Sequence, residues 1–75
     1  MKIDKKTTVR DVMEVFYHRW AIVTMKNGNK EKLYIVDVDY ETWGYDMIIY
    51  NHTGSNSYGT DDIPFSKIDS IELVE

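Results

Sequence analysis

The chain has no cysteine, only one proline (Pro64) and no long run of apolar residues. Without cysteine it can form no disulfide, no thiolate metal site and no cysteine nucleophile. A transmembrane helix needs about 18 or more consecutive apolar residues, and no such run is present. The first residues, MKIDKKTT, also lack the apolar segment of a secretory signal. These absences predict a cytoplasmic protein whose stability comes from packing alone.

What is present is enough apolar material for one small core. Apolar residues make up 43% of the 75 residues and aromatic residues 13%, which is too much for a disordered chain. A chain of this length buries only about 60% of its unfolded surface, so one core must serve the whole molecule. We therefore expect a single domain over residues 1–75.

Charge is distributed unevenly along the chain. Residues 1–32 carry eight Lys or Arg and four Asp or Glu, whereas residues 33–75 carry one Lys and nine Asp or Glu, and the net charge is −4. Such polarity can create a partner surface, but it can also make two parts of one folded chain attract each other. The sequence leaves both interpretations open.

A short helix is predicted over residues 8–17. Thr8 and Asp11 have the spacing of a capping box, with Asp in the position where Glu is usual. Apolar side chains then recur at helical spacing at Val9, Val12, Met13 and Phe16. A helix of this length is marginal in isolation, so we expect this apolar stripe to pack on a sheet.

The strongest local signal is a β-hairpin. Residues 20–26 and 30–41 are rich in β-branched and aromatic residues, and the Asn27-Gly28 pair between them suits a tight hairpin turn. Alternation along the second strand predicts one face that is core throughout. This face carries Tyr34, Val36, Val38 and Tyr40. The opposite face begins apolar and becomes acidic.

Three more strands are predicted, over residues 45–51, 60–65 and 70–74. The polar, glycine-containing stretch HTGSNSYG at 52–59 has little packing capacity, so we expect it to be the most mobile part of the chain. Pro64 cannot donate to a sheet ladder, which restricts it to an edge, a bulge or the end of a strand. The SKI stretch that follows suits a single tight turn into the last strand.

This order of elements predicts a mainly β (α+β) fold with a short N-terminal helix and a five-stranded, strongly bent antiparallel sheet. The layout resembles the small barrels of the Sm-like and SH3 type. The closing segment IPFSKIDSIEL is similar to the end of the YolD-like proteins of Gram-positive bacteria and their phages. The RNA-binding motif typical of true Sm proteins is not recognisable in this sequence. A two-layer sheet covered by one helix is the alternative fold.

Patterns that would indicate catalysis or metal binding are sparse. His18 and His52 stand far apart and belong to no metal motif, and the four glycines lie in separate turns rather than in a phosphate-binding loop. Four carboxylates, at Asp37, Asp39, Glu41 and Asp46, could approach one another, but they lack the order of a calcium loop. We expect no enzymatic activity, no cofactor and no metal.

The first functional hypothesis is a protein-binding module or inhibitor. Tyr and Trp are the usual anchors of interfaces, and this chain has more of them than a small barrel needs inside. The predicted partner site combines three aromatic residues with an acidic rim that would steer a basic partner. Its members are Trp43, Tyr45, Tyr58, Asp37, Asp39, Glu41 and Asp46. In size and charge the chain resembles small phage proteins that block host nucleic-acid enzymes, anti-CRISPR proteins among them.

The alternative hypothesis is nucleic-acid binding by an Sm-like barrel or a transcriptional regulator. Aromatic rings can stack on bases, but an acidic protein must then focus its cations on one patch. The candidate patch consists of Lys5, Lys6, Arg10, Lys26, Lys30 and Lys32, with Lys2 beside it. Open barrel edges at the fourth and fifth strands would also allow homo-oligomers to form by strand addition.

Overall fold

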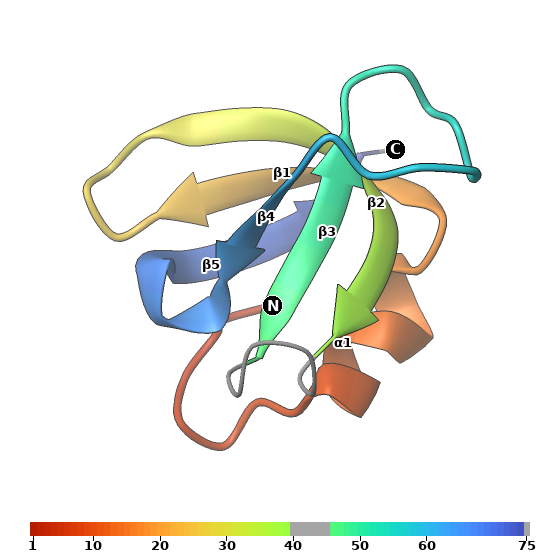
Figure 1. Ribbon diagram of the computed structural model, residues 1–75. Helices are drawn as coiled ribbons and strands as arrows, with labels where there is room; N and C mark the ends of the chain where they lie inside the picture. Colours follow the sequence, from red (N-terminus) through yellow and green to blue (C-terminus); the bar gives the residue numbers. More distant parts are fainter. Residues whose placement is uncertain (40–45, 75) are drawn as a thin grey trace.

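The described part of the chain folds as one short α-helix followed by five antiparallel strands that form a single sheet (Figure 1). A computed structural model describes residues 1–39 and 46–74. The elements are α1 (Val9–Phe16), β1 (Arg19–Met25), β2 (Lys30–Asp39), β3 (Met47–Asn51), β4 (Asp61–Pro64), the 3₁₀ helix η1 (Phe65–Lys67) and β5 (Ile68–Leu73). The predicted class, mainly β with an N-terminal helix and five strands, is confirmed.

Helix α1 begins with a complete capping box. The Thr8 hydroxyl accepts a hydrogen bond from the Asp11 backbone N–H (3.1 Å), and the Asp11 carboxylate accepts one from the Thr8 N–H (3.0 Å). Val12 and Phe16 are fully buried, while Val9 and Met13 are partly buried against the same core. The predicted apolar stripe is therefore confirmed, and it packs mainly against β2.

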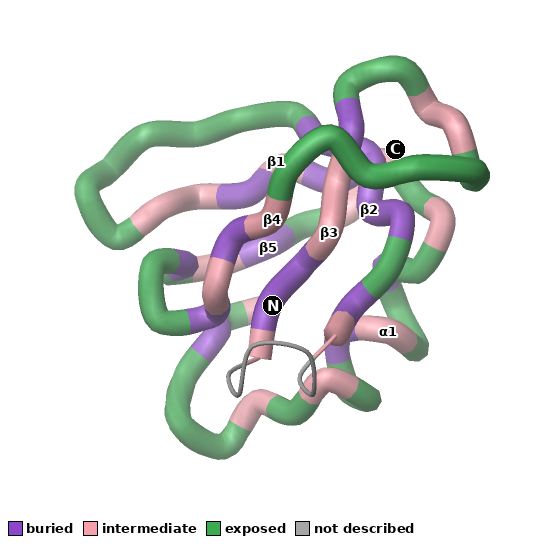
Figure 2. Tube along the Cα trace, viewed as in Figure 1, coloured by how far each residue is buried: buried purple, intermediate pink, exposed green. Residues whose placement is uncertain are grey.

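The strands follow the order β4-β3-β2-β1-β5, so β4 and β5 are the two edges of the sheet. The sheet curves around one core, to which α1 and all the strands contribute buried side chains (Figure 2). The 3₁₀ helix η1 carries the chain from one edge strand to the other, at the place where the sequence predicts a tight turn. Pro64 is the last residue of β4, where its missing N–H disrupts no central ladder.

A β-bulge in β2 changes which side chains reach the core. The register between β2 and β3 shifts between Ile35 and Asp37. Because a bulge inserts one extra residue, the alternation of faces reverses there. Leu33 and Ile35 before the bulge and Val38 after it all join the core cluster, while Tyr34 lies outside that cluster. The prediction of one uninterrupted core face along β2 is therefore wrong.

The outer edge of β5 is already paired with the first residues of the chain. The Ile3 N–H donates to the Asp69 carbonyl (3.0 Å), the Ile71 N–H donates to the Met1 carbonyl (2.8 Å), and Lys2 forms a bridge with Ser70. The Met1 ammonium also lies 2.7 Å from a carboxylate oxygen of Glu72. The expectation of an open edge at β5 is corrected by this pairing.

At the β4 edge, the Asp61 carboxylate accepts a hydrogen bond from the backbone N–H of Asp62 (2.8 Å). Together with Pro64, which has no N–H, this leaves a short acidic edge that is poorly suited to pairing with another strand. Strand addition between copies stays a prediction.

Candidate functional site

The structure describes only part of the predicted partner site. Trp43, Tyr45 and Glu41 lie outside the described residues. Asp37 is exposed on β2, where its carboxylate accepts a hydrogen bond from the Val38 N–H (2.8 Å).

Asp39 is half-buried and stands opposite Met47, the residue that follows Asp46, so the described acidic residues gather where β2 ends and β3 begins. Tyr58 belongs to the segment that leaves the other end of β3. The structure therefore does not bring Tyr58 to the acidic rim.

The predicted cationic patch is divided among several surfaces. Lys5 and Lys26, with Lys2, line one groove. Lys6 lies elsewhere, in a hollow with Asp11 and Glu14.

The remaining cations of that set lie apart from the groove. Arg10 is paired with Glu14 at 2.9 Å in an exposed i,i+4 ion pair on α1. Lys30 and Lys32 are exposed on β2. No single focused patch forms from this set.

The most organised surface in the described residues is a stack of rings on the outer side of the hairpin. The rings of Tyr17 and His18 are stacked with centroids 3.8 Å apart, and His18 lies parallel to Tyr34 at 6.5 Å. Trp20 meets Tyr34 edge-on at 5.4 Å. We call Tyr17, His18, Trp20, Tyr34 and Tyr58 the aromatic face.

Local backbone geometry explains why the first rings of the stack meet. Helix α1 ends at Phe16, and His18 has a left-handed backbone with φ of 56°, the conformation that commonly terminates helices. The His18 N–H donates to the Ile35 carbonyl (2.8 Å), which attaches the turn to β2. The register of the hairpin then places Trp20 directly opposite Tyr34. The helix exit and the hairpin together build the stack.

The segment between β3 and β4 is organised around one buried side chain, Asn51. Its amide oxygen accepts hydrogen bonds from the N–H groups of Thr53 (3.1 Å) and Gly54 (2.9 Å). Its amide nitrogen donates to the carbonyls of Ser55 (2.7 Å) and Tyr58 (2.9 Å). Asn51 has no exposed surface. High mobility of 52–59 stays a prediction, but the segment is anchored by the residue that lies just before it.

The same segment packs on the aromatic face. The Tyr34 hydroxyl donates to the Asn56 side-chain oxygen, and the hydroxyls of Thr53 and Tyr58 lie 3.3 Å apart. Gly54 has φ of 81° and lies so close to Trp20 that a Cβ there would be 3.3 Å from the indole. A side chain at Gly54 would therefore be both strained and crowded.

The rings differ strongly in exposure. Tyr34 is 8% exposed, whereas Tyr17 is 45% and Tyr58 52% exposed. Two rings of the face are therefore exposed, while the buried Tyr34 ring meets Trp20 and its hydroxyl bonds to Asn56. The Lys32 ammonium stands 5.2 Å from the centre of the Trp20 ring, a cation–π distance. This ammonium group gives the aromatic face a cationic neighbour.

The sequence predicted Tyr34 on a core face and selected neither Trp20 nor Tyr17 for the partner site. The pairing of Trp20 with Tyr34 depends on the length of the hairpin loop. A two-residue turn at Asn27-Gly28 would place Trp20 opposite Ile35. In the structure the Met25 N–H donates to the Asn29 carbonyl (2.7 Å), so the loop has one more residue and Trp20 lies opposite Tyr34. The contribution of Tyr17 depends on the left-handed turn at His18, which no local pattern indicates.

A separate acidic region surrounds Tyr50. Its pKa is raised, first because the hydroxyl is partly desolvated and then because the carboxylates of Asp61, Glu31 and Asp62 oppose a phenolate. The His52 ring meets the Tyr50 ring edge-on at 5.7 Å. Among the described residues, no group of three or more His, Asp or Glu side chains is arranged to hold a metal ion.

The chain matches no protein-family model, and comparisons with curated proteins and with solved structures give no match. In the described part of the chain, the single helix α1 is too short to cross a membrane. The arguments for function therefore rest on the geometry above.

Proposed function

We propose that this chain is a non-enzymatic protein-binding module and that the aromatic face is its contact surface. The observation that carries the proposal is the presence of two exposed rings, Tyr17 and Tyr58, on segments that meet the buried Tyr34 through the His18 ring and the Asn56 side chain. Tyr and Trp contribute large contact area with few rotatable bonds, and they are enriched among the residues that dominate interface energies.

Rigidity strengthens this argument. Binding costs free energy when flexible side chains and loops become ordered, and a surface that is already ordered avoids much of that cost. Here the Tyr34 hydroxyl bonds to Asn56, and Asn51 holds the segment that carries Tyr58. The face is thus supported by hydrogen bonds made before any partner arrives.

The positive charge beside the aromatic face favours an acidic patch on the partner. Lys32 is exposed, and its ammonium group lies beside the Trp20 ring. Such complementary charges mainly increase association rates and help to select the partner. Inhibition of a nucleic-acid-handling protein is a finer form of the same proposal, supported by size and overall charge alone. The acidic site with Trp43 and Tyr45 stays a prediction.

The test compares capture of proteins from an extract of the source cells by immobilised wild-type chain and by two variants, Tyr17→Ala and Tyr58→Ala. Val15→Ala is the matched control, because Val15 lies near the end of α1 and is 38% exposed but does not belong to the aromatic face. We expect both tyrosine variants to bind the captured partner at least about tenfold more weakly, roughly 1.4 kcal/mol, with unfolding midpoints near that of wild type. Undiminished binding by both variants would place the contact surface elsewhere.

Single-stranded nucleic acid is the second candidate ligand, because a lysine over the Trp20 ring also suits stacked bases. The net charge of −4 and the dispersed lysines weigh against it. Fluorescence anisotropy with labelled single strands at low and high salt separates the candidates. Binding that is strong at low salt and lost in Trp20→Ala would favour nucleic acid, and no binding at low salt would exclude it.

A further inference from the structure

A groove lies on a different part of the molecule from the aromatic face. Its volume is about 560 Å³, in the range of ligand-binding clefts. Four parts of the chain surround it: residues 2–7, the start of the β1–β2 turn at Lys26, the residue before β3, and residues 64–69. The groove therefore exists only in the folded chain.

Backbone hydrogen bonds hold each wall of the groove in place. The Ile3 N–H donates to the Asp69 carbonyl (3.0 Å) and the Lys26 N–H donates to the Lys67 carbonyl (3.0 Å). At the far side, the Phe65 N–H donates to the Asp46 carbonyl (2.9 Å). These contacts join the N-terminal segment, the hairpin and η1 into one preformed frame.

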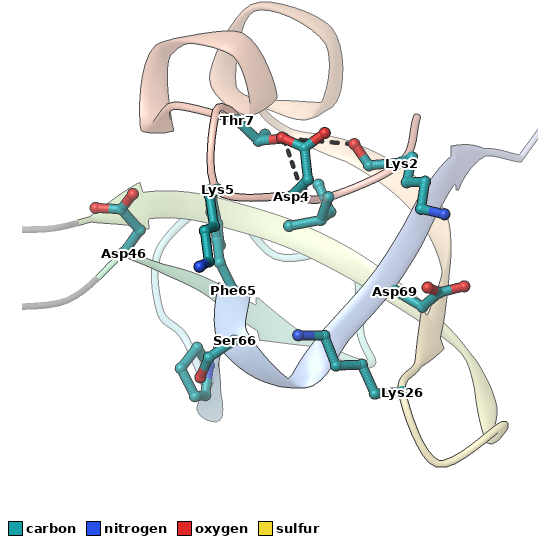
Figure 3. A pocket seen from close by; sticks show the side chains of 11 residues that line it. Lys2, Asp4, Lys5, Thr7, Lys26, Asp46, Phe65, Ser66 and Asp69 are labelled. Atoms are coloured by element: carbon teal, nitrogen blue, oxygen red, sulfur yellow. Dashed lines mark hydrogen bonds between the residues drawn. The ribbon is translucent and has the colours of Figure 1, made fainter.

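Cationic and acidic side chains occupy different parts of this groove. Figure 3 shows the amino groups of Lys5 and Lys26 over the middle of the groove, while the carboxylates of Asp46 and Asp69 lie toward its two ends. The Asp4 carboxylate accepts hydrogen bonds from the Lys6 N–H (2.8 Å) and the Thr7 hydroxyl (3.3 Å), so it is used within its own turn. The middle of the groove is therefore cationic although the whole protein is acidic.

Among residues 1–39 and 46–74, no hydrogen bond or ion pair engages the ammonium groups of Lys5 and Lys26 or the hydroxyl of Ser66. Beside them, Pro64 and the edges of Phe65 and Ile3 supply apolar surface. Donors next to apolar surface suit a ligand that combines a carboxylate with a hydrocarbon group.

We propose that this groove binds an acidic peptide segment of a partner protein. A Glu or Asp carboxylate would lie between Lys5, Lys26 and the Ser66 hydroxyl, and a neighbouring apolar side chain would cover Pro64 and Phe65. A peptide fits better than a small molecule because Ile3 and Phe65 are only 6% and 8% exposed, too little apolar surface to enclose a free ligand. A peptide gains further contacts along the rim. This site is independent of the aromatic face.

The test is an NMR titration of the ¹⁵N-labelled full chain with three end-capped tripeptides, Glu-Leu-Glu, Gln-Leu-Gln and Lys-Leu-Lys, up to about 5 mM, where contacts worth roughly 3 kcal/mol become visible. We expect Glu-Leu-Glu to shift the amide signals of residues 2–5, Lys26 and 64–69, with much smaller shifts for the other two. The Lys5→Gln, Lys26→Gln double variant should weaken these shifts at least about tenfold. The matched control is Lys30→Gln, an exposed lysine outside the groove.

Several results would overturn this proposal. The first is that no amide signal shifts at the highest peptide concentration, and the second is that Gln-Leu-Gln causes equal shifts. The others are unchanged binding by the double variant and shifts confined to Tyr17, Trp20 and Tyr58. The last result would support the aromatic face and reject the groove, so the two proposals fail separately. Because both lysines are exposed, the double variant should unfold near the wild-type midpoint, which urea titration checks.

Discussion

Helix α1 and the segment after Asn51 both pack against the sheet without belonging to it, but different kinds of interaction hold them in place. The helix is held by apolar side chains, with Val12 and Phe16 fully or almost fully buried. The segment at 52–60 has hardly any apolar residue to bury, and it is held by hydrogen bonds to the single amide of Asn51. One attachment is spread over several residues, and the other is concentrated in one.

This difference matters for what surrounds each region. Apolar packing tolerates some variation in side-chain shape, because its free energy is divided among many weak contacts. A buried polar side chain must instead have every partner in place, since an unpaired buried group costs more than a normal hydrogen bond contributes. The aromatic face depends on both regions, because Tyr17 follows the helix and Tyr58 lies on the segment held by Asn51.

The largest effect should come from removing the main anchor of the helix. Phe16→Ala should lower the free energy of unfolding by about 3–5 kcal/mol, because the ring is 2% exposed and its loss leaves a cavity. Urea titration measures the change. Val15→Ala on the exposed side of the same helix should change it by less than about 0.5 kcal/mol. A loss that small for Phe16→Ala would mean that the helix does not contribute to the core.

The corresponding change in the other region is Asn51→Ala. It removes the amide oxygen that accepts from the Thr53 and Gly54 N–H groups and the amide nitrogen that donates to the Ser55 and Tyr58 carbonyls. We therefore expect the free energy of unfolding to fall by about 2–3 kcal/mol.

Hydrogen exchange should show faster exchange at Thr53 and Gly54, while the amides of α1 keep their protection. Ser57→Ala, which removes an exposed hydroxyl in the same segment, is the control and should have little effect. Unchanged exchange at both amides would contradict the role of Asn51.

A third variant tests how closely the segment packs on β3. A Cβ at Gly59 would overlap the Cγ2 methyl of Ile49, so Gly59→Ala should destabilise the protein by about 1–2 kcal/mol. Ile49→Ala removes that methyl group and supplies a double-mutant cycle. The cost of Gly59→Ala should shrink in the Ile49→Ala background, and an equal cost in both backgrounds would show that the overlap is not its cause.

A smaller effect is expected where the segment meets the aromatic face. Tyr34→Phe removes the hydroxyl that bonds to Asn56 and keeps the ring, so we expect a loss of about 1 kcal/mol. Asn56→Ala should cost a similar amount, and the double variant should cost less than the sum of the two. Additive losses would indicate that the two side chains do not interact in solution.

The smallest effect concerns the start of the helix. The hydrogen bond from the Thr8 backbone N–H, followed by that from the Thr8 side chain, holds the pKa of Asp11 below its ordinary value of 3.8. A carboxyl whose pKa is lowered by folding stabilises the fold above its unfolded pKa, and this stabilisation is lost as the pH falls through the folded pKa. NMR titration of Asp11 should therefore give a pKa below 3.8.

Two variants separate the causes of that pKa. Thr8→Ala should raise the pKa of Asp11 toward the ordinary value, because the side-chain hydrogen bond is lost. Arg10→Ala should raise it less, because the Arg10 charge is the weakest of the influences that lower it. An equal shift in both variants would mean that charge, rather than the capping box, controls Asp11.

Most of the fold follows from local patterns. Helical spacing at Val9 to Phe16, the Asn27-Gly28 turn and the placement of Pro64 predict the helix, the first hairpin and an edge strand, because each depends on residues that are neighbours in the chain. Less of the candidate site could be predicted. The sequence shows a surplus of Tyr and Trp. Which of these residues form the aromatic face depends on the register between β1 and β2 and on the backbone conformation of His18.

The sequence by itself determined the number and order of the elements and the capping of the helix, because these depend on spacing and side-chain type. Only the tertiary structure decided the bulge that brings Leu33, Ile35 and Val38 into one core, the pairing of residues 1–3 with β5, the burial of Asn51 and the meeting of Lys5 with Lys26 in one groove. These contacts join residues far apart in the chain. Their free energy depends on the position of one element against another, which no local pattern contains.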